Sequence, residues 1–535
     1  MGIRRTQFTQ SISSVNVQQA KPVESFTVNI DDIETAFIRP LSLTLVRDQL
    51  ALPLWKKEGV LEIAIGGSQS LLLVDEFAMM YGCPVRTIRM PEKDLVALIN
   101  QAFDKATQSA MDVMEEMAQD GNIEMDGEIL VGEDLLDNPD AAPMVRFVNS
   151  LLSQAIKQKA SDIHIEPFEK DMSVRLRIDG VLQEDVQPPK GWKEQLVSRI
   201  KIMSNLDIAK KNIPQDGRIR TRMAGREIDI RVSTLPVRHG ERVVMRILEK
   251  KAEFSLDGVG MSSDTLAEFR EFITRPYGII LVCGPTGSGK TTTLYSALSE
   301  INSPDLNILT IEDPVEYELR GIGQTQVNHK IDLSFARVIR AHLRQDPDVI
   351  LVGETRDKET AENAIQASLT GHLVFSTIHT NDAPTAFTRL VDMGIEPFLV
   401  ATSLVAVLAQ RLVRRLCPHC KEAYQPTVAE LAKAGREELL LLGVTPETFR
   451  GTLYRPKGCE ECGNKGFSGR MGIYELMEVA ENIRSAVTAG KDASVIKKIC
   501  VENGMRTLRG DGLKKVLDGQ TSLDEIYRVT AEGME

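Results

Sequence analysis

The sequence predicts an α/β protein of several domains, and three observations favour this class. At 535 residues the chain is too long for one hydrophobic core, so roughly two to four domains are expected. Strand-like alternation and helix-like apolar stripes follow one another along most of its length. Residues 278–295, GIILVCGPTGSGKTTTLY, place an apolar strand before a glycine-rich turn and a helix, an arrangement typical of parallel sheets that bind ligands at their strand ends.

The N-terminal third predicts a flexible end, a small domain and a linker. Residues 1–32 are expected to be flexible, since the first 20 are rich in Ser, Gln and Thr. Residues 33–120 predict a first α/β domain, in which GVLEIAIGG, SLLLVDEFAMMYG, PVRTIRM and EKDLVALINQAF read as strand, helix, strand and helix. Residues 121–143 carry seven acidic residues and no basic one, which predicts a solvated acidic linker.

Four further segments follow. Residues 144–250 begin with a helix, Met144 to Lys159, and continue with the strand patterns SDIHIEPF, SVRLRIDG, EIDIRVSTLP and ERVVMRIL. They predict a second N-terminal domain in which a sheet packs on helices. Residues 251–416 form the parallel α/β domain, residues 417–470 a subdomain with four cysteines, and residues 471–535 a C-terminal helical region.

The glycine-rich turn predicts phosphate binding. It matches G-x-x-x-x-G-K-T, in which backbone N–H groups surround phosphate oxygens. Lys290 would neutralise the β- and γ-phosphate oxygens, and the Thr291 hydroxyl would complete a Mg²⁺ coordination shell. An accidental match is disfavoured because the required strand and helix flank the turn. The predicted nucleotide-binding residues are Gly284, Pro285, Thr286, Gly287, Ser288, Gly289, Lys290, Thr291 and Thr292.

Three further strands end in residues suited to catalysis. DVILVGE ends at Glu354, which could orient or deprotonate a water molecule, although a strand ending in a solvated carboxylate is an equally good interpretation of this segment alone. LNILTIEDPVEY delivers Glu312, and HLVFSTIHTND delivers His379. Because parallel strands present their carboxyl ends at one edge, the three together favour an active site.

Two cysteine pairs predict a metal site. Cys417, Cys420, Cys459 and Cys462 form C-x₂-C-x₃₈-C-x₂-C, and four thiolates can bind Zn²⁺ tetrahedrally. The gap is longer than in most zinc fingers, and redox-active C-x-x-C pairs are the alternative. Neither pair opens a helix after a βαβ strand, which disfavours redox chemistry.

Composition argues against two classes of function. A net charge of −12 and 5% aromatic residues give little support to an extended nucleic-acid-binding face. The longest uncharged apolar run, residues 397–409, is shorter than the ~20 residues of a membrane-spanning helix. The N-terminus has no signal-peptide pattern, so we expect a cytoplasmic protein.

These motifs resemble those of the type II/type IV secretion ATPases. Four segments are similar, in order, to the family's Walker A, Asp-box, Walker B and His-box motifs: GPTGSGKTTTLY, TIEDPVEY, LRQDPDVILVGETRD and HLVFSTIHTNDA. Four earlier segments resemble parts of the family's second N-terminal domain: ASDIHIEP, RLRIDG, PQDGRI and RVSTLP…GERVVMRIL. The likeness runs from about Ala141 to the C-terminus. It implies a RecA-like P-loop ATPase core, a PAS-like second N-terminal domain and a structural zinc subdomain.

The resemblance also implies residue roles. Lys290 and Thr291 would hold ATP and Mg²⁺, Glu354 would be the Walker B catalytic acid, Glu312 would support the attacking water and His379 would sense the γ-phosphate. Two residues of the second N-terminal domain, Arg218 and Arg231, would act as arginine fingers. Thr355 departs from the family pattern, which commonly has an apolar residue there.

The function implied is that of a hexameric motor that hydrolyses ATP. It would power protein export through the type II secretion system by driving pseudopilus assembly, and would attach peripherally to the inner membrane through partner proteins. A pilus-extension ATPase is the alternative, although RMGIYELMEV looks more like the secretion branch. A nucleic-acid translocase and a regulatory module without turnover are weaker alternatives.

Overall fold

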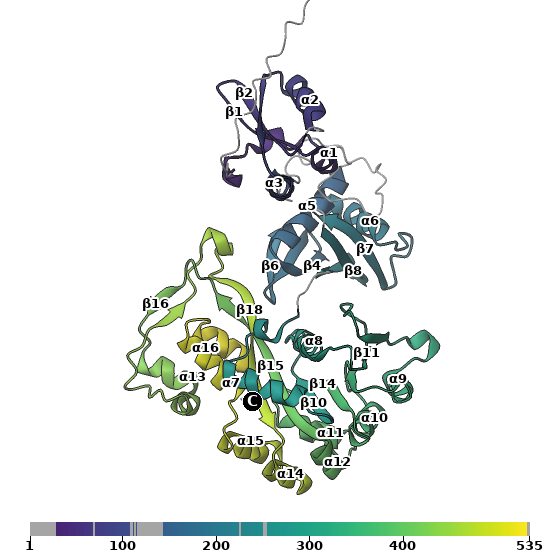
Figure 1. Cartoon of the computed structure of the whole chain (residues 1–535), viewed down its shortest axis with the longest axis vertical. Helices are drawn as coiled ribbons and strands as arrows, with labels where there is room; N and C mark the ends of the chain where they lie inside the picture. The colour runs from purple at the N-terminus through teal and green to yellow at the C-terminus, as the bar shows by residue number, and fades with distance from the viewer. Residues whose placement is uncertain are drawn as a thin grey trace, which may run out of the picture. The chain divides into compact units, whose positions relative to one another are not determined.

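The computed structural model describes residues 28–67, 70–106, 111, 114, 143–223, 226–249 and 254–531. The chain divides into two compact units, residues 1–251 and 252–535, and Figure 1 labels their elements. The expected flexible N-terminus and acidic linker fall mainly on residues 1–27 and 121–142, which lie outside the described residues.

The first part of unit 1 is a three-stranded sheet, β1-β2-β3, with three helices. Strands β1 and β2 form an antiparallel hairpin, whereas β2 and β3 are parallel and α2 connects them. The predicted order of strand, helix, strand and helix is confirmed from β2 to α3, and α1 and β1 precede it. The bounds are η1 Ile30–Asp32, η2 Thr35–Phe37, α1 Leu43–Gln49, β1 Ala51–Lys57, β2 Val60–Ile65, α2 Leu71–Tyr81, β3 Val85–Arg89 and α3 Glu92–Ala106.

The second part of unit 1 is a six-stranded antiparallel sheet in the order β6-β5-β4-β9-β8-β7. Alternate residues such as Ile163 and Ile165 face a core that α5 and α6 cover, and the other sheet face is polar. The four predicted strands are confirmed, and β6 and β7 add to them. The bounds are α5 Pro143–Lys157, β4 Ala160–Pro167, β5 Met172–Ile178, β6 Val181–Val186, η4 Lys190–Trp192, α6 Lys193–Met203, β7 Gln215–Met223, β8 Arg226–Val237 and β9 Gly240–Glu249.

Unit 2 is built on a seven-stranded sheet in the order β12-β11-β13-β14-β10-β15-β18. All neighbouring strands are parallel except β15 and β18. Every residue of β10 is buried, as expected for a strand covered on both faces. Ile279 and Leu281 face the core packed by α9 to α12, whereas Ile280 and Val282 face the core packed by α7 and α8.

The elements of unit 2 up to the cysteine subdomain are η5 Leu256–Gly258, α7 Ser263–Ile273, β10 Gly278–Cys283, α8 Lys290–Ile301, β11 Ile308–Glu312, β12 Gly323–Gln326, η6 His329–Ile331, α9 Phe335–His342, β13 Val349–Val352, α10 Lys358–Leu369, β14 Leu373–Ile378, α11 Thr385–Asp392, α12 Pro397–Ser403 and β15 Leu404–Leu416. The remaining elements are β16 Glu422–Tyr424, α13 Val428–Leu441, β17 Leu453–Arg455, η7 Glu460–Cys462, β18 Phe467–Glu478, α14 Glu481–Thr488, α15 Ala493–Glu502, α16 Leu508–Leu517 and α17 Leu523–Thr530.

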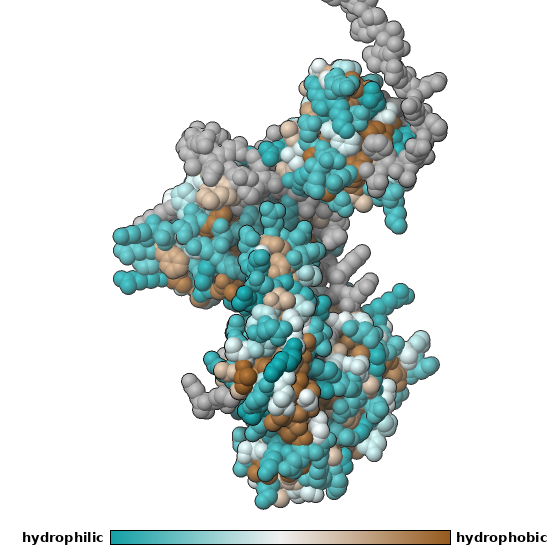
Figure 2. Space-filling model, turned by 90° about the vertical axis from the view of Figure 1, so that its left-hand side faces the viewer, coloured by the Kyte–Doolittle hydropathy of each residue, from teal (hydrophilic) through white to brown (hydrophobic). Residues whose placement is uncertain are grey.

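The face of the molecule seen in Figure 2 is mainly hydrophilic. Figure 2 shows polar side chains over most of the face in view, with smaller hydrophobic patches between them, as is usual for folded domains. The uncharged run 397–409 is divided between the short helix α12 and the buried strand β15. In the part of the chain that the structure describes, no helix combines the length and apolar character needed to cross a bilayer.

Candidate functional site

The glycine-rich turn joins β10 to α8 and presses against β15. Gly284, Gly287 and Gly289 all have positive φ, at 149°, 79° and 91°. A Cβ on Gly284 would lie 2.5 Å from the backbone oxygen of Gln410, and one on Gly289 would lie 2.7 Å from its Nε2 atom. Two of these glycines are therefore required both by backbone conformation and by the close approach of β15.

The turn is suited to hold an anion. Helix α8 begins at Lys290 without a side-chain cap, so its first N–H groups and the positive end of its dipole face the turn. Lys290 Nζ donates to the carbonyl oxygens of Gly284 and Pro285 at 2.7 and 3.1 Å. Burial lowers the pKa of Lys290, while the nearby carboxylate of Glu354 opposes this shift. Ser288 Oγ is buried and has no hydrogen-bond partner among the described residues, which fits a phosphate oxygen at this place.

The structure brings the predicted strand-end residues beside the turn. Glu312 is the last residue of β11, Glu354 follows β13 by two residues and His379 directly follows β14. Because these strands and β10 are parallel neighbours, their carboxyl ends share one edge. A cavity of about 460 Å³ opens there, lined by Thr286–Thr292, Leu294, Tyr295, Glu312–Pro314, Glu316, Phe335, Leu351, Gly353, Glu354, Arg356, Thr377, His379, Leu412 and Arg470.

Glu354 lies between two cationic or potentially cationic groups. Its Oε1 atom is 2.8 Å from His379 Nε2, and its Oε2 atom is 2.6 Å from a guanidinium nitrogen of Arg356. Burial raises the pKa of Glu354, but the Arg356 hydrogen bond and the charges of His379, Arg356 and Lys290 outweigh burial and hold the pKa below its ordinary value. Glu354 is thus kept as a carboxylate, the form that can accept a proton.

Glu312 is buried and is held by internal hydrogen bonds. Its Oε1 atom accepts from Thr310 Oγ1 at 2.5 Å and from Gln324 Nε2 at 3.2 Å, and its Oε2 atom accepts from the Tyr295 hydroxyl. Burial and this contact raise the pKa of Tyr295. The carboxylate therefore ties the end of β11 to α8 while it lines the cavity.

The two predicted arginine fingers lie in unit 1, on the polar face of the antiparallel sheet. Arg218 on β7 is directly opposite Arg231 on β8, which is in turn opposite Arg246 on β9. Arg218 contacts Asp229 at 3.5 Å, and Arg246 contacts Asp162 at 2.9 Å. Like charges directly opposite one another destabilise a sheet, and Asp229 and Asp162 offset part of this repulsion.

The four predicted cysteines lie together. Their sulfur atoms are all within 4.8 Å of one another, and three pairs are 3.7 to 3.9 Å apart. A tetrahedral zinc site with Zn–S bonds of about 2.3 Å places its sulfurs about 3.8 Å apart. The geometry therefore fits Zn²⁺, which would be held by Cys417, Cys420, Cys459 and Cys462.

Backbone N–H groups also donate hydrogen bonds to the cysteine sulfurs, which favours their thiolate form. Gly466 and Cys459 donate to the sulfur of Cys462 at 3.1 and 3.3 Å, and Gly458 donates to that of Cys420 at 3.3 Å. Burial raises the pKa of Cys462, but the two backbone donors outweigh it and hold that pKa below its ordinary value. His419 is exposed and does not belong to the cluster.

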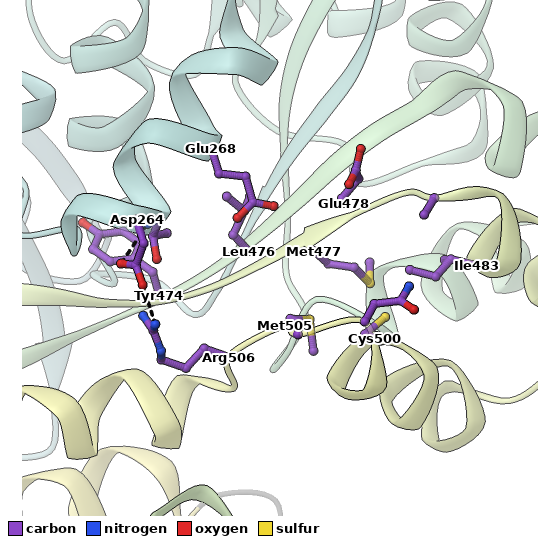
Figure 3. A pocket seen from close by; sticks show the side chains of 14 residues that line it. Asp264, Glu268, Tyr474, Leu476, Met477, Glu478, Ile483, Cys500, Met505 and Arg506 are labelled. Atoms are coloured by element: carbon purple, nitrogen blue, oxygen red, sulfur yellow. Dashed lines mark hydrogen bonds and ion pairs between the residues drawn. The ribbon is translucent and has the colours of Figure 1, made fainter. Parts of the chain in front are cut away.

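A second cavity, of about 290 Å³, lies elsewhere in unit 2 between α7, β18 and the C-terminal helices. Figure 3 shows its carboxylates, Glu268 and Glu478, together with the ion pair between Asp264 and Arg506, whose side chains are 2.5 Å apart. It contains none of the residues of the glycine-rich turn or the strand ends, so it is distinct from the nucleotide-type site.

Sequence reasoning did not identify two residues that shape the first cavity. Tyr295 lies within the apolar stripe of α8, where a tyrosine reads as a core residue. Gln410 lies in an apolar strand, and its Oε1 atom accepts from Thr293 Oγ1 at 2.8 Å. A lone glutamine within the buried strand β15 was the one available signal, because burial of an amide requires a partner.

Known proteins similar to this chain are secretion proteins. The family described as "Type II/IV secretion system protein" matches residues 137–528. "Type II secretion system protein E" of Aeromonas hydrophila is 47% identical over 514 residues, covering 95% of this chain and 98% of the relative. "Type II secretion system ATPase E" of Vibrio cholerae is 49% identical over 450 residues, covering 83% and 87%. Among solved structures, the ATPase DotB of Legionella pneumophila aligns with a TM-score of 0.52 at 20% identity, covering 77% of this chain and 100% of that one, which bears on the fold alone.

Proposed function

This chain belongs to the type II/IV secretion system protein family, and we propose that it is an ATP hydrolase that powers protein export through a type II secretion system. One observation carries the proposal: Glu354 and His379 meet the glycine-rich turn at a single sheet edge. This arrangement combines a phosphate cradle with a group that can accept a proton, as hydrolysis of a phosphoanhydride requires. Relatives of nearly the same length carry the name of the type II secretion system.

Each site residue then has a chemical role. Lys290 and the backbone N–H groups of residues 284–292 other than Pro285 hold the phosphates. Thr291 would ligate Mg²⁺, which would supply positive charge beside the phosphates. Glu354 orients the attacking water and accepts its proton. His379 contacts the γ-phosphate, and its 2.8 Å approach to Glu354 Oε1 joins that contact to the base.

Glu312 acts on the attacking water indirectly and does not contact it. Because both of its oxygens accept hydrogen bonds from protein groups, it supports the water by fixing the edge where β11 ends. Glu312 has this indirect role because it is buried and its oxygens are already occupied by protein donors.

Arg218 and Arg231 supply positive charge from the second N-terminal domain. Charge on the transferring phosphoryl group requires cationic stabilisation, which arginine fingers deliver when two lobes close. In a homo-hexameric ring this closure and its release become mechanical work, used here to drive pseudopilus assembly. The first N-terminal domain, residues 33–120, docks on inner-membrane secretion proteins, so the chain is cytoplasmic and peripherally attached through its partners.

The pilus-extension ATPase remains the second candidate, because it shares the site. The names of the relatives favour the secretion system. A nucleic-acid translocase has less support, since the chain is acidic and poor in aromatic residues.

Replacement of Lys290 by alanine tests the proposal. We expect Lys290→Ala to lose ATP hydrolysis by at least about 100-fold while its circular dichroism spectrum stays that of the wild type. Lys358→Ala is the matched control, because Lys358 lies in the same unit in an exposed pair with Glu362. Wild-type turnover by Lys290→Ala would reject the site.

A further inference from the structure

The segment that carries His379 is held from several sides. Residues 379–383, called the His379 segment, follow β14 and precede α11. Arg411 donates to the backbone oxygen and Oδ1 of Asn381 at 3.2 and 3.0 Å. The Cys283 thiol donates to the backbone oxygen of Asp382 at 3.4 Å. These contacts come from β15 and β10, the strands on which the glycine-rich turn also rests.

The C-terminal region supplies further contacts to this segment. Lys497 on α15 pairs with Asp382 at 3.3 Å. Glu475 on β18 accepts a hydrogen bond from the backbone N–H of Ala383 at 2.8 Å. The helical region that follows the core sheet therefore reaches the segment that presents His379 to Glu354.

Glu475 joins two backbones at once. Its other oxygen, Oε2, accepts from the N–H of Leu508 at 3.2 Å, and Leu508 is the first residue of α16. The side chain is 1% exposed, and burial raises its pKa. The positive end of the α16 dipole faces this carboxylate. A buried carboxylate is costly unless such partners compensate it, so its presence here indicates a specific role.

Packing around Glu475 makes the connection rigid. Figure 3 shows Met477 of β18 and, in the C-terminal helical region, Cys500 and Met505. Met477, Cys500 and Met505 belong to one buried core. A displacement of α16 therefore acts on the His379 segment through Glu475 rather than being absorbed by a loose contact.

We propose that Glu475 is a positioning residue for ATP hydrolysis, which fixes the His379 segment to α16 and so keeps His379 in contact with Glu354. The inference rests on the proposed function, because it concerns the same reaction. Glu475 contacts backbone groups and not the phosphates, so its loss should reduce turnover without weakening nucleotide binding.

Glu475→Gln in the full chain tests this role. The amide has one oxygen, so one of the two backbone N–H groups loses its acceptor. We expect kcat to fall by about 10- to 100-fold, as for a misplacement of about 1 Å, while the Kd for a fluorescent ATP analogue stays within about twofold. Hydrogen exchange of the amides of residues 380–384 should become faster.

Glu525→Gln is the matched control. Glu525 is also a buried carboxylate of the C-terminal region, but it contacts Arg414 and Arg528 and not the His379 segment. We expect its kcat within about twofold of the wild type and no faster exchange at residues 380–384. An equal loss of kcat in both variants would reject positioning by Glu475, since general loosening of the region would then explain it.

A second variant with a smaller change tests the proposal in case Glu475→Gln does not fold. Lys497→Met removes the partly exposed ion pair with Asp382 and the charge of Lys497 near Glu475, and kcat should fall about two- to fivefold. Unchanged kcat in both Glu475→Gln and Lys497→Met, with an active wild type, overturns this inference alone. A wild-type chain that does not hydrolyse ATP overturns the proposed function and this inference with it.

Discussion

The ionisation of Glu354 depends on one arginine more than on any other partner. Burial alone would raise the pKa of this carboxyl, and the Arg356 hydrogen bond is the first contribution that lowers it. His379 and Lys290 add smaller effects of the same sign. Arg356, two residues after Glu354, thus keeps Glu354 in its carboxylate form at lower pH.

We expect Arg356→Gln to move the acid limb of kcat/KM to higher pH. The carboxylate is the active form, so activity is lost as pH falls through the pKa of Glu354. In the wild type that pKa lies below its ordinary value, and without Arg356 the raising effect of burial is opposed only by His379 and Lys290, so the pKa moves upward. ATPase rates between pH 4 and 8 would measure the shift.

Arg340→Gln is the control for that experiment, because Arg340 pairs with Glu359 on the outside of α10. An acid limb that stays in place in Arg356→Gln would show that another group controls the profile.

Sequence patterns predicted the residues of the site that lie next to their own strands. Glu312, Glu354 and His379 lie at or within two residues of the end of an apolar run, and Lys290 belongs to the G-x-x-x-x-G-K-T motif, so local spacing sufficed. The support for Glu312 from Tyr295 could not be predicted, because neither residue reveals its partner. The contact of Gln410 with Thr293 joins residues 117 positions apart, a pairing that only the folded sheet determines.

The cysteine subdomain lies between two paired strands. β15 and β18 are antiparallel neighbours in the main sheet, and residues 417–466 leave and return between them. This segment has the short sheet β16-β17 and helix α13, and a metal ion would join its two ends.

We expect Cys417→Ser to lose about one zinc ion per chain and to destabilise residues 417–466. Metal content by elemental analysis and hydrogen exchange of that segment would measure both effects. Cys83→Ser, at a buried cysteine of unit 1, should retain its zinc. Unchanged metal content in Cys417→Ser would reject the four-thiolate site.

Helix α17 is attached to β15 through a buried carboxylate. Glu525 accepts from the backbone and guanidinium of Arg414 and from Arg528. Burial raises the pKa of Glu525, but these hydrogen bonds outweigh it and lower the pKa to about 2. A lowered pKa in the folded state stabilises the fold above the unfolded pKa of about 4.3, and this contribution is lost as pH falls toward 2.

Glu525→Gln should therefore lower the free energy of unfolding by about 3 kcal/mol at pH 7. The difference from the wild type should shrink as pH falls below about 4.3. Urea unfolding followed by circular dichroism at several pH values would measure it. A difference independent of pH would show that packing, not the charge, is responsible.

At the scale of the whole molecule, the chemistry is divided between two units. Each has its own buried cores, and the phosphate cradle lies in unit 2 whereas the row of arginines lies in unit 1. Hydrolysis by the proposed mechanism needs both, so residues of unit 1 should affect turnover more than binding.

We expect Arg231→Ala to reduce kcat by about 100-fold or more while nucleotide binding persists. Arg222→Ala is the control, because Arg222 lies near the end of β7 in an exposed pair with Glu227. Steady-state ATPase kinetics and binding of a fluorescent analogue would separate the two effects. Normal kcat in Arg231→Ala would exclude it as an arginine finger.

The fold could be predicted in its parts but not in its strand order. Alternation in residues 160–249 predicted a sheet packed on helices, and the order of strand, glycine-rich turn and helix predicted the parallel sheet. The place of β18 beside β15 was not evident, because RMGIYELMEV pairs with a strand some 60 residues earlier. Long-range pairing of this kind is decided by the whole sheet and not by the local pattern.

Strand β15 also has a mechanical consequence. Gln410 touches the glycine-rich turn near the middle of the strand, and Leu416, its last residue, adjoins the first cysteine of the cluster. Six residues of strand separate these points, a lever arm of roughly 20 Å. Tilting this arm by about 10° around the turn would carry its far end by about 3 Å, so a small change beside the phosphates is magnified at the cysteines.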